Sequence, residues 1–273
     1  TLAATTLAGV APAGIDVQGK YAYVTDLTSN YLEVVDIDNP AIPASVGHVT
    51  VGTSPYGIAV QGHYAYVTDE AGGAGGNGQI TVVDISNPIA PVVVNSINIP
   101  TGYKPTGIAV QGKYAYVTEE GGGPANFMIF DVSNPANLVL ASSMAASGAD
   151  FVTVSGRYAY ITYISSGVVV IVDVSNPAGP FFPGGSFNSD AHGSIAISGR
   201  YAYVPNSQNG TFQVYDASAV TTGTASAIGT LSLTGGSAPY GVSVQGRYAY
   251  VANSGNNTMQ IIDVSNPTSL VSV

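Results

Sequence analysis

Short apolar and aromatic segments alternate with polar turns along the whole chain. In one stretch, the apolar run Gly57–Val60 is followed by a turn and then by Tyr64–Val67. After a polar loop, Ile80–Asp84 and Val92–Ile99 continue the pattern. Segments of this length that are rich in β-branched and aromatic residues and bounded by Gly, Asn, Asp or Pro are typical of strands. None has the apolar period of a helix, so the pattern predicts units of four strands.

This unit recurs six times. The motif QGKYAYV at residues 18–24 returns at intervals of 43–50 residues, at 61–67, 111–117, 155–161, 198–204 and 245–251. A period of this size with four short strands per unit is typical of β-propeller blades. We therefore expect an all-β, six-bladed propeller with four antiparallel strands per blade, built as a single domain over residues 1–273. The blades are expected at residues 10–52, 53–102, 103–146, 147–189, 190–235, and 236–273 together with 1–9.

The two ends of the chain are both predicted to belong to the outer strand of the sixth blade. Residues 1–9 match the fourth segment of a repeat, as at 44–52, and residues 268–273 match the start of that segment, as at 41–46. The simplest interpretation is that an N-terminal strand, 1–9, closes the ring within the last blade. In the alternative, one end pairs with a neighbouring molecule, because outer blade strands are open edges.

The Tyr-Ala-Tyr pattern predicts how neighbouring blades pack. Tyr21 and Tyr23 are two residues apart in a strand and project from one face of the sheet, whereas Ala22 and Val24 project from the other. We expect the bulky face of one blade to pack against the small face of the next, with the tyrosines as core residues and not as a ligand-stacking surface.

The repeats resemble known families. The segment Tyr250–Asp263 (YVANSGNNTMQIID) resembles the YVTN repeat of archaeal and bacterial surface-layer propellers. The segments Leu32–Ile37 and Val168–Val174 resemble the LVIVD repeat. The resemblance covers the whole chain and implies export and an extracellular or cell-surface setting, with no catalytic residues to transfer. The fifth blade departs from it, because Asp216–Ala219 stands where the other blades have Asp-Val-Ser-Asn-Pro or a close variant.

Composition narrows the function classes. The net charge of −10 argues against nucleic acid as a partner, since phosphates require a basic surface. The chain has no cysteine, and no apolar run approaches the ~18 residues of a membrane span. It starts at Thr1 without a basic segment followed by an apolar one, which suits an exported chain whose signal has been removed.

Charged residues fall at repeated positions on one face of the predicted propeller. The turn between the first two strands carries Lys20, His63, Lys113, Arg157, Arg200 and Arg247. The third strand ends at Asp36, Asp84, Asp131, Asp173, Asp216 and Asp263. We expect the two sets to pair within each blade and each aspartate to accept N–H groups of the turn that follows it.

The opposite face is predicted to be acidic and holds the candidate ligand-binding residues. These are Asp26, Asp69, Glu70, Glu119, Glu120, Asp150, Tyr56 and Tyr240. Within this set, Asp69 and Glu70 open a Gly-rich loop that extends to residue 78 and form a candidate Ca²⁺ site, since Ca²⁺ takes oxygen ligands. The loop lacks the alternating carboxylates of a dedicated calcium loop, so solvated acidic loops without a bound cofactor are the favoured interpretation and a cation site is the alternative.

Catalytic motifs are weak. His48, His63 and His192 lie far apart, and there is no Gly-x-Ser-x-Gly elbow, phosphate loop or zinc signature. The favoured hypothesis is a non-enzymatic structural or adhesive propeller, extracellular or on the cell surface. It would assemble with itself into a filament or layer through exposed strand edges and termini, or contact other surface proteins or glycans. The alternative is a module that binds a ligand or cation at the acidic face. A propeller hydrolase or lyase using His192, Asp150 and Asp190 has the least support.

Overall fold

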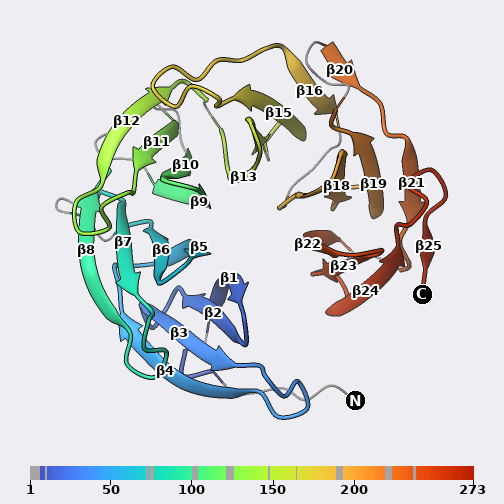
Figure 1. Cartoon of the computed structure of the whole chain (residues 1–273). Helices are drawn as coiled ribbons and strands as arrows, with labels where there is room; N and C mark the ends of the chain where they lie inside the picture. The colour runs from blue at the N-terminus through green and yellow to red at the C-terminus, as the bar shows by residue number, and fades with distance from the viewer. Residues whose placement is uncertain are drawn as a thin grey trace. The chain divides into compact units, whose positions relative to one another are not determined.

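A computed structural model describes residues 7–9, 11–71, 73, 77–99, 104–120, 126–146, 148–163, 165–188, 193–218, 223–235 and 238–273. All regular secondary structure in these ranges is strand, arranged in six sheets (Figure 1). The predicted all-β propeller of six blades is confirmed. The chain divides into two compact units, Thr1–Ser147 and Gly148–Val273, with three blades each. In the described ranges, no helix has the length and apolar character that crossing a membrane requires.

The first unit contains three four-stranded antiparallel sheets with neighbouring strands in chain order. The first blade comprises β1 (Pro12–Gln18), β2 (Tyr21–Asp26), β3 (Tyr31–Asp36) and β4 (Ala44–Thr50). The second comprises β5 (Pro55–Gln61), β6 (Tyr64–Asp69), β7 (Gln79–Asp84) and β8 (Val92–Asn98). The third comprises β9 (Lys104–Gln111), β10 (Tyr114–Glu120), β11 (Phe127–Asp131) and β12 (Val139–Met144).

The second unit repeats this plan with one addition. Its first blade comprises β13 (Phe151–Ser155), β14 (Tyr158–Tyr163), β15 (Val168–Asp173) and β16 (Gly185–Asn188), and a short strand, β20 (Gly223–Ala225), is added to it. The next blade comprises β17 (Ala196–Ser198), β18 (Tyr201–Asn206), β19 (Thr211–Asp216) and β21 (Gly229–Ser232). The last comprises β22 (Pro239–Gln245), β23 (Tyr248–Asn253), β24 (Thr258–Asp263) and β25 (Val271–Ser272).

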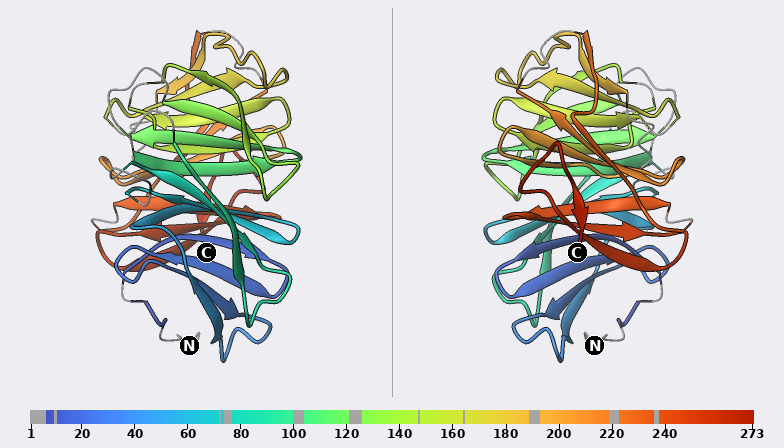
Figure 2. Two further views of the ribbon diagram at one scale, coloured as in Figure 1. Left: turned by 90° about the vertical axis from the view of Figure 1, so that its left-hand side faces the viewer. Right: turned by 90° about the vertical axis from the view of Figure 1, so that its right-hand side faces the viewer.

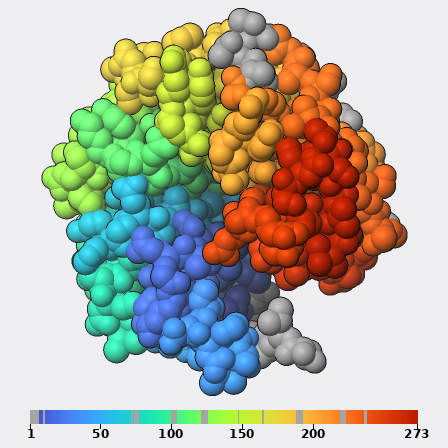
Figure 3. Space-filling model, turned by 45° about the vertical axis from the view of Figure 1, so that its right-hand side comes forward, coloured from blue at the N-terminus to red at the C-terminus, as the bar shows by residue number. Residues whose placement is uncertain are grey.

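Apolar side chains fill the space between successive blades, as the Tyr-Ala-Tyr pattern predicts. In the first unit, Tyr23, Leu32 and Val34 of one blade belong to the same buried cluster as Ala65 and Val67 of the next. An equivalent cluster joins the second and third blades, which are in contact along their faces in Figure 3 (cyan to green). Stacked sheets are also visible within each unit from the side (Figure 2). Each fully buried large aliphatic side chain contributes roughly 1.5–3 kcal/mol, so these interfaces hold the blades of each unit together.

A polar link also joins neighbouring blades of the first unit. The side-chain amide of Gln18 donates to the carbonyl oxygen of Gly62 over 2.6 Å and accepts from the Gly62 N–H over 2.9 Å. Gln61 makes the same pair of bonds with Gly112. These glycines have φ of +63°, a conformation that glycine adopts at little cost. The glutamine side chain of one turn therefore links that turn to the corresponding turn of the next blade.

The last blade differs from the expected closure. Its fourth strand is β25, which pairs with β24 through Ile262–Ser272 and Asp263–Val271. The C-terminal residues therefore supply a strand there, as predicted. Residues 1–6 lie outside the described ranges, while Leu7, Ala8 and Gly9 belong to no strand. For those three residues the predicted strand 1–9 is wrong, because the backbone of Ala8 bonds a side chain, Glu33 of β3, where a strand would bond a backbone.

The fifth strand of the β13–β16 sheet is also unexpected. β20 comes from the connection between β19 and β21 and runs parallel to β16, with Gly185 opposite Gly223 and Phe187 opposite Ala225. A hydrogen bond between the hydroxyls of Ser186 and Thr224 accompanies the pairing. The outer edge of β16 is therefore covered by a segment of the neighbouring blade.

Candidate functional site

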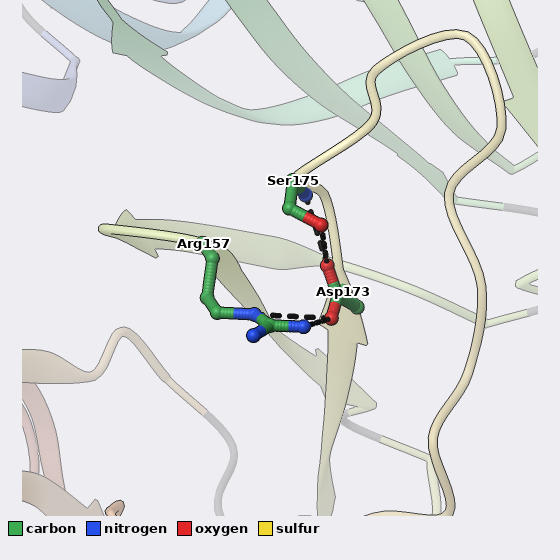
Figure 4. A network of polar contacts seen from close by, with 3 residues as sticks. All are labelled: Arg157, Asp173 and Ser175. Carbon is green, nitrogen blue, oxygen red and sulfur yellow. Dashed lines mark hydrogen bonds and ion pairs between the residues drawn. The ribbon is translucent and has the colours of Figure 1, made fainter.

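The repeated aspartates at the ends of the third strands form small polar clusters within their own blades. In the β13–β16 blade, the Arg157 Nε lies 3.2 Å from Asp173 Oδ2, and the N–H and hydroxyl of Ser175 both donate to Asp173 Oδ1 (Figure 4). Burial acts to raise the pKa of Asp173, but the donors from Ser175 and Arg157 outweigh it and lower the pKa. Lysine or arginine pairs with aspartate in the same way in four other blades, at Lys20–Asp36, Lys113–Asp131, Arg200–Asp216 and Arg247–Asp263.

The predicted turn role of these aspartates is confirmed. Each one accepts the backbone N–H two residues further on, and the acceptors are Asp36, Asp84, Asp131, Asp173, Asp216 and Asp263. In the second blade, where histidine replaces lysine or arginine, the positive field of His63 contributes to lowering the pKa of Asp84 after the larger effect of Ser86. In the five blades with lysine or arginine at this position, the basic side chain also lies over the first tyrosine of the motif, for example Arg157 over Tyr158 at 5.2 Å. The basic and acidic residues therefore pair within five of the blades, and all six aspartates order the turn that follows them.

Acid is expected to weaken the fold through these turns. The arginine partner lowers the pKa of Asp216 and of Asp263 to about 2, so each contributes stability at neutral pH that is lost between about pH 4 and pH 2. We expect Asp216→Asn to lower the free energy of unfolding at pH 7 by about 1 kcal/mol, because the pair is partly exposed. Urea unfolding at pH 7 and pH 3 tests this, and an equal loss at both values would contradict it.

Asp26 is the last residue of β2, at the opposite end of its blade from Asp36. Its side chain is 1% exposed and accepts the N–H groups of Ala11, Thr28 and Ser29. Burial acts to raise the pKa of Asp26, but these donors outweigh it and the pKa is lowered. Asp26 therefore caps its own β2–β3 loop. Asn206, at the same position of β18, caps its loop through the N–H groups of Gln208 and Asn209.

Asp69 ends an identical hexapeptide, YAYVTD, but has a different environment. It is fully buried, and its Oδ2 accepts the Thr81 hydroxyl over 2.6 Å and the Gln79 amide over 3.4 Å. Within the described residues, no hydrogen bond of good geometry reaches its Oδ1, although the backbone N–H of Gly52 also acts to lower the pKa of this carboxyl group. Burial, only partly offset by these neutral donors, raises the pKa of Asp69 to about 7. Burial thus brings the pKa of Asp69 close to neutral pH, whereas that of Asp26 is lowered.

The remaining candidate acids lie at other positions of the blades. Glu119 is fully buried at the equivalent position of β10. Glu70 points to the next blade, where its Oε2 lies 3.4 Å from Lys104 Nζ. Glu120 is exposed at the end of β10, and Asp150 is half-buried. The interpretation of these residues as solvated loops is therefore wrong for Asp26, Asp69 and Glu119, since their side chains are needed inside the fold.

The other predicted site residues also have local partners. The carbonyl oxygen of Tyr56 accepts the Thr25 hydroxyl over 2.8 Å, which links two blades. The ring of Tyr240 meets Phe151 edge-on at 5.9 Å. His48 is exposed on β4 beside the ring of Tyr31. Asp190 and His192 lie outside the described residues, so the hydrolase hypothesis is not tested there. A ligand-binding role for Tyr56, Tyr240 and the acids stays a prediction.

Two acids, the buried Glu33 and the half-buried Asp16, escaped the sequence analysis. Glu33 of β3 is 1% exposed, and both carboxylate oxygens accept the Ala8 N–H at 2.9 Å. Asp16 of β1 accepts the N–H of Val60 in the next blade over 2.6 Å, and burial raises its pKa. The sequence feature that could have identified Glu33 is the position of an acid within the apolar segment Leu32–Val35.

No three His, Cys, Asp or Glu side chains in the described ranges are grouped so that they would hold a metal ion. A shallow hollow of about 330 Å³ lies between the β18–β19 loop, Ser232 and Ala238. It is lined by none of the predicted site residues. Asn209, the first residue of an Asn-Gly-Thr sequence, is among the lining residues, and its Oδ1 accepts the Thr211 hydroxyl over 2.6 Å.

The repeated blades, the capped loops and the paired turns together define a β-propeller whose repeat residues are structural. The LVIVD repeat model matches residues 11–51, 55–99, 104–146, 147–185, 191–221 and 235–273, one match for each blade. The chain belongs to the LVIVD repeat family. A comparison with curated proteins finds no match.

Solved structures of low sequence identity share the fold. The periplasmic gluconolactonase of Pseudomonas aeruginosa has a TM-score of 0.75 and 14% identity, over 96% of this chain and 84% of that chain. A protein of unknown function from Desulfotomaculum acetoxidans has a TM-score of 0.74 and 14% identity, over 93% and 79%. The propeller domain of Cps50 (Swd1) from Myceliophteria thermophila has a TM-score of 0.70 and 12% identity, over 99% and 87%. At these identities the likeness is one of fold alone.

Proposed function

We propose that this LVIVD-repeat propeller is a non-enzymatic structural or adhesive protein of the cell surface or extracellular space. It acts by associating with copies of itself, or with other surface proteins or glycans, through the outer edges of its blades. The observation that carries the proposal is the character of the outer strands of the first unit. β4, β8 and β12 each end a sheet and contain no Asp, Glu, Lys or Arg. Uncharged open edges are templates for strand addition.

The use of the charged side chains supports a non-catalytic role. Asp26 caps a loop, the Asp36-type residues order turns, and Glu70 pairs with Lys104. A catalytic acid and base would instead have to converge on a shared substrate position. Aliphatic side chains are exposed along the outer parts of the blades, among them Ile42, Ile89, Val92, Val94 and Val139.

A second candidate function is cation binding beside Asp69. The Oδ1 of this buried carboxyl group, which no hydrogen bond of good geometry reaches within the described residues, favours it, since Ca²⁺ takes carboxylate and carbonyl oxygens. Thermal unfolding with and without CaCl₂ separates the two candidates. A stabilisation by Ca²⁺ that disappears in Asp69→Asn supports the cation site, and an equal response of both proteins removes it.

Sedimentation velocity over a wide range of protein concentration tests the proposed function. We expect reversible, concentration-dependent association, visible as larger species by negative-stain microscopy at high concentration. Because a gluconolactonase has the same fold, we also test for enzymatic activity. Hydrolysis of glucono-δ-lactone is measured by pH-stat titration. A monomer at every concentration would overturn self-association, and lactone hydrolysis well above the buffer rate would overturn the non-enzymatic role.

A further inference from the structure

Two neighbouring hairpins of the second unit carry the pattern Asn-x-Thr, which is an acceptor sequence for N-linked glycans when x is not proline. One spans residues 209–211 (Asn-Gly-Thr), between β18 and β19, and the other spans residues 256–258 (Asn-Asn-Thr), between β23 and β24. In both, the asparagine is the third of four loop residues. A third match at residues 266–268 has the excluded proline. Because so short a pattern also arises by chance, the geometry of each asparagine decides whether it can act.

Both asparagine side chains are held by the threonine of their own motif. Thr211 Oγ1 donates to Asn209 Oδ1 over 2.6 Å, and Thr258 Oγ1 donates to Asn256 Oδ1 over the same distance. A donor on the amide oxygen draws electron density away from the nitrogen and makes its N–H groups more acidic. An amide nitrogen attacks poorly until it gives up a proton, so the threonine hydroxyl prepares the asparagine for transfer of a sugar.

The two amides differ at the nitrogen. Asn256 Nδ2 donates to the carbonyl oxygens of Thr234 and Gly235 over 3.5 Å and 3.4 Å. Asn209 is exposed, and in the described part of the chain its Nδ2 donates to no acceptor. Transfer of a sugar replaces one N–H bond of this nitrogen, which must therefore be open to the incoming sugar. Asn209 is the better acceptor of the two.

The surface beside Asn209 has room for a sugar. The hollow of about 330 Å³ is lined by Asn209 itself and by uncharged neighbours, among them Ser207, Gln208 and Ser232. Hydroxyl and amide groups both donate and accept hydrogen bonds, and the hydroxyl groups of a sugar do the same. A glycan on Asn209 therefore meets a surface of matching polarity where it leaves the protein.

We propose that Asn209 is an N-glycosylation site of the folded protein. The donor is an oligosaccharide linked through a diphosphate to a lipid. Asn209 Nδ2 forms a bond to C1 of the first sugar, and the bond from C1 to the diphosphate oxygen breaks. The lipid diphosphate leaves with the electron pair, and the Nδ2 proton passes to a base of the transferase. This site adds a modification to the proposed function and rests on the export that the function requires, since such acceptors mark surface loops of exported proteins.

Transfer to the folded protein tests the site. Trypsin cleaves after Arg200 and Arg247, so the two asparagines fall in separate peptides, 201–247 and 248–273. The protein is incubated with a lipid-linked oligosaccharide and an oligosaccharyltransferase that requires only Asn-x-Thr, and mass spectrometry follows both peptides. We expect transfer to Asn209 to be about five-fold faster or more than to Asn256, whose hydrogen bonds must break first. No transfer to Asn209, or equal rates at the two sites, would overturn the proposal.

Substitutions of the threonines test the role of the hydroxyl group. Thr211→Val keeps the shape of the side chain but removes the donor to Oδ1, so transfer to Asn209 is expected to fall about ten-fold or more. Thr211→Ser keeps the donor and is expected to retain transfer. The matched control, Thr258→Val, leaves transfer to Asn209 unchanged, and urea unfolding checks that each variant is folded. Transfer at the parent rate in Thr211→Val would also overturn the proposal.

Sedimentation velocity of the unmodified protein keeps this site separate from the proposed function. A monomer at every concentration that still accepts a glycan at Asn209 would remove self-association and leave the glycosylation site. Reversible association without any transfer to Asn209 would leave the proposed function and remove the site.

Discussion

Replacing Asp69 by asparagine is expected to stabilise the protein at pH 8 by about 1–3 kcal/mol. The folded chain holds this buried carboxyl group with its pKa raised to about 7, whereas the unfolded chain releases the proton near pH 4. Keeping the ionised group inside the protein therefore costs on the order of 4 kcal/mol above pH 7. Asparagine removes that cost but leaves an amide N–H without a partner, which offsets about 1–3 kcal/mol.

The pH dependence has a definite sign. Because the folded state binds the proton more tightly, the contribution of Asp69 to stability falls as the pH rises from about 4 to about 7 and is constant above that. The Asp69→Asn variant lacks this decline. Urea unfolding at intervals from pH 4.5 to pH 8 measures the difference between the two proteins. A difference that does not grow with pH would show that Asp69 titrates normally.

Asp26→Asn is the matched control. The residue ends the same hexapeptide, yet its pKa is lowered by backbone donors that outweigh burial. Asparagine keeps one oxygen acceptor, as Asn206 does in its own loop, and loses the other, which accepts the Ala11 N–H. The variant is expected to lose about 1 kcal/mol at pH 7, a change opposite in sign to that at position 69.

Gly57→Ala is expected to lower the free energy of unfolding by about 3 kcal/mol. A Cβ at this position would overlap the backbone carbonyl oxygen of Thr106 in the next blade and come within 2.8 Å of Thr68 Oγ1. The Thr68 hydroxyl already accepts the Gly57 N–H and donates to the Thr106 carbonyl. The methyl group therefore has to push the two blades apart and strain a buried hydrogen-bonded link.

Gly179→Ala provides the comparison for this substitution. Its Cβ would lie 3.3 Å from the side-chain amide of Asn176 in an exposed turn, where the neighbour can move. We expect a change within about 0.5 kcal/mol. Urea unfolding monitored by tyrosine fluorescence serves both variants. A loss below about 1 kcal/mol for Gly57→Ala would mean that the blades separate at little cost.

The repeated parts of the fold were predictable because their cause is local. The Tyr-Ala-Tyr strand and the final aspartate of the third strand occur in every blade, after a turn that reads Gln-Gly in four blades and Ser-Gly in two. The hydrogen bonds of the aspartates join residues close in the chain. Asp173, for example, bonds Ser175 two residues on and Arg157 across a hairpin. Periodicity therefore indicated the blades, the basic turns and their acidic partners.

The candidate site was less predictable, because it depends on contacts distant in sequence. Asp26 and Asp69 end identical hexapeptides, but only Asp26 meets backbone donors from its following loop and from Ala11. The Gly-rich insertion after Asp69 brings no such donors in the described residues, and burial then determines its pKa. β20 was missed for a related reason: three residues are too short to show a period of two.

The strand β20 shows how an insertion in a connecting loop can cover the open strand edge of a neighbouring blade. A blade edge that a neighbour's longer loop covers is closed to partners, and an edge without one is open. Transferring the β19–β21 connection into the third blade would cover β8 from within the same molecule. Loop length would then determine which blade edges are open to a further strand, with no change to the blades themselves.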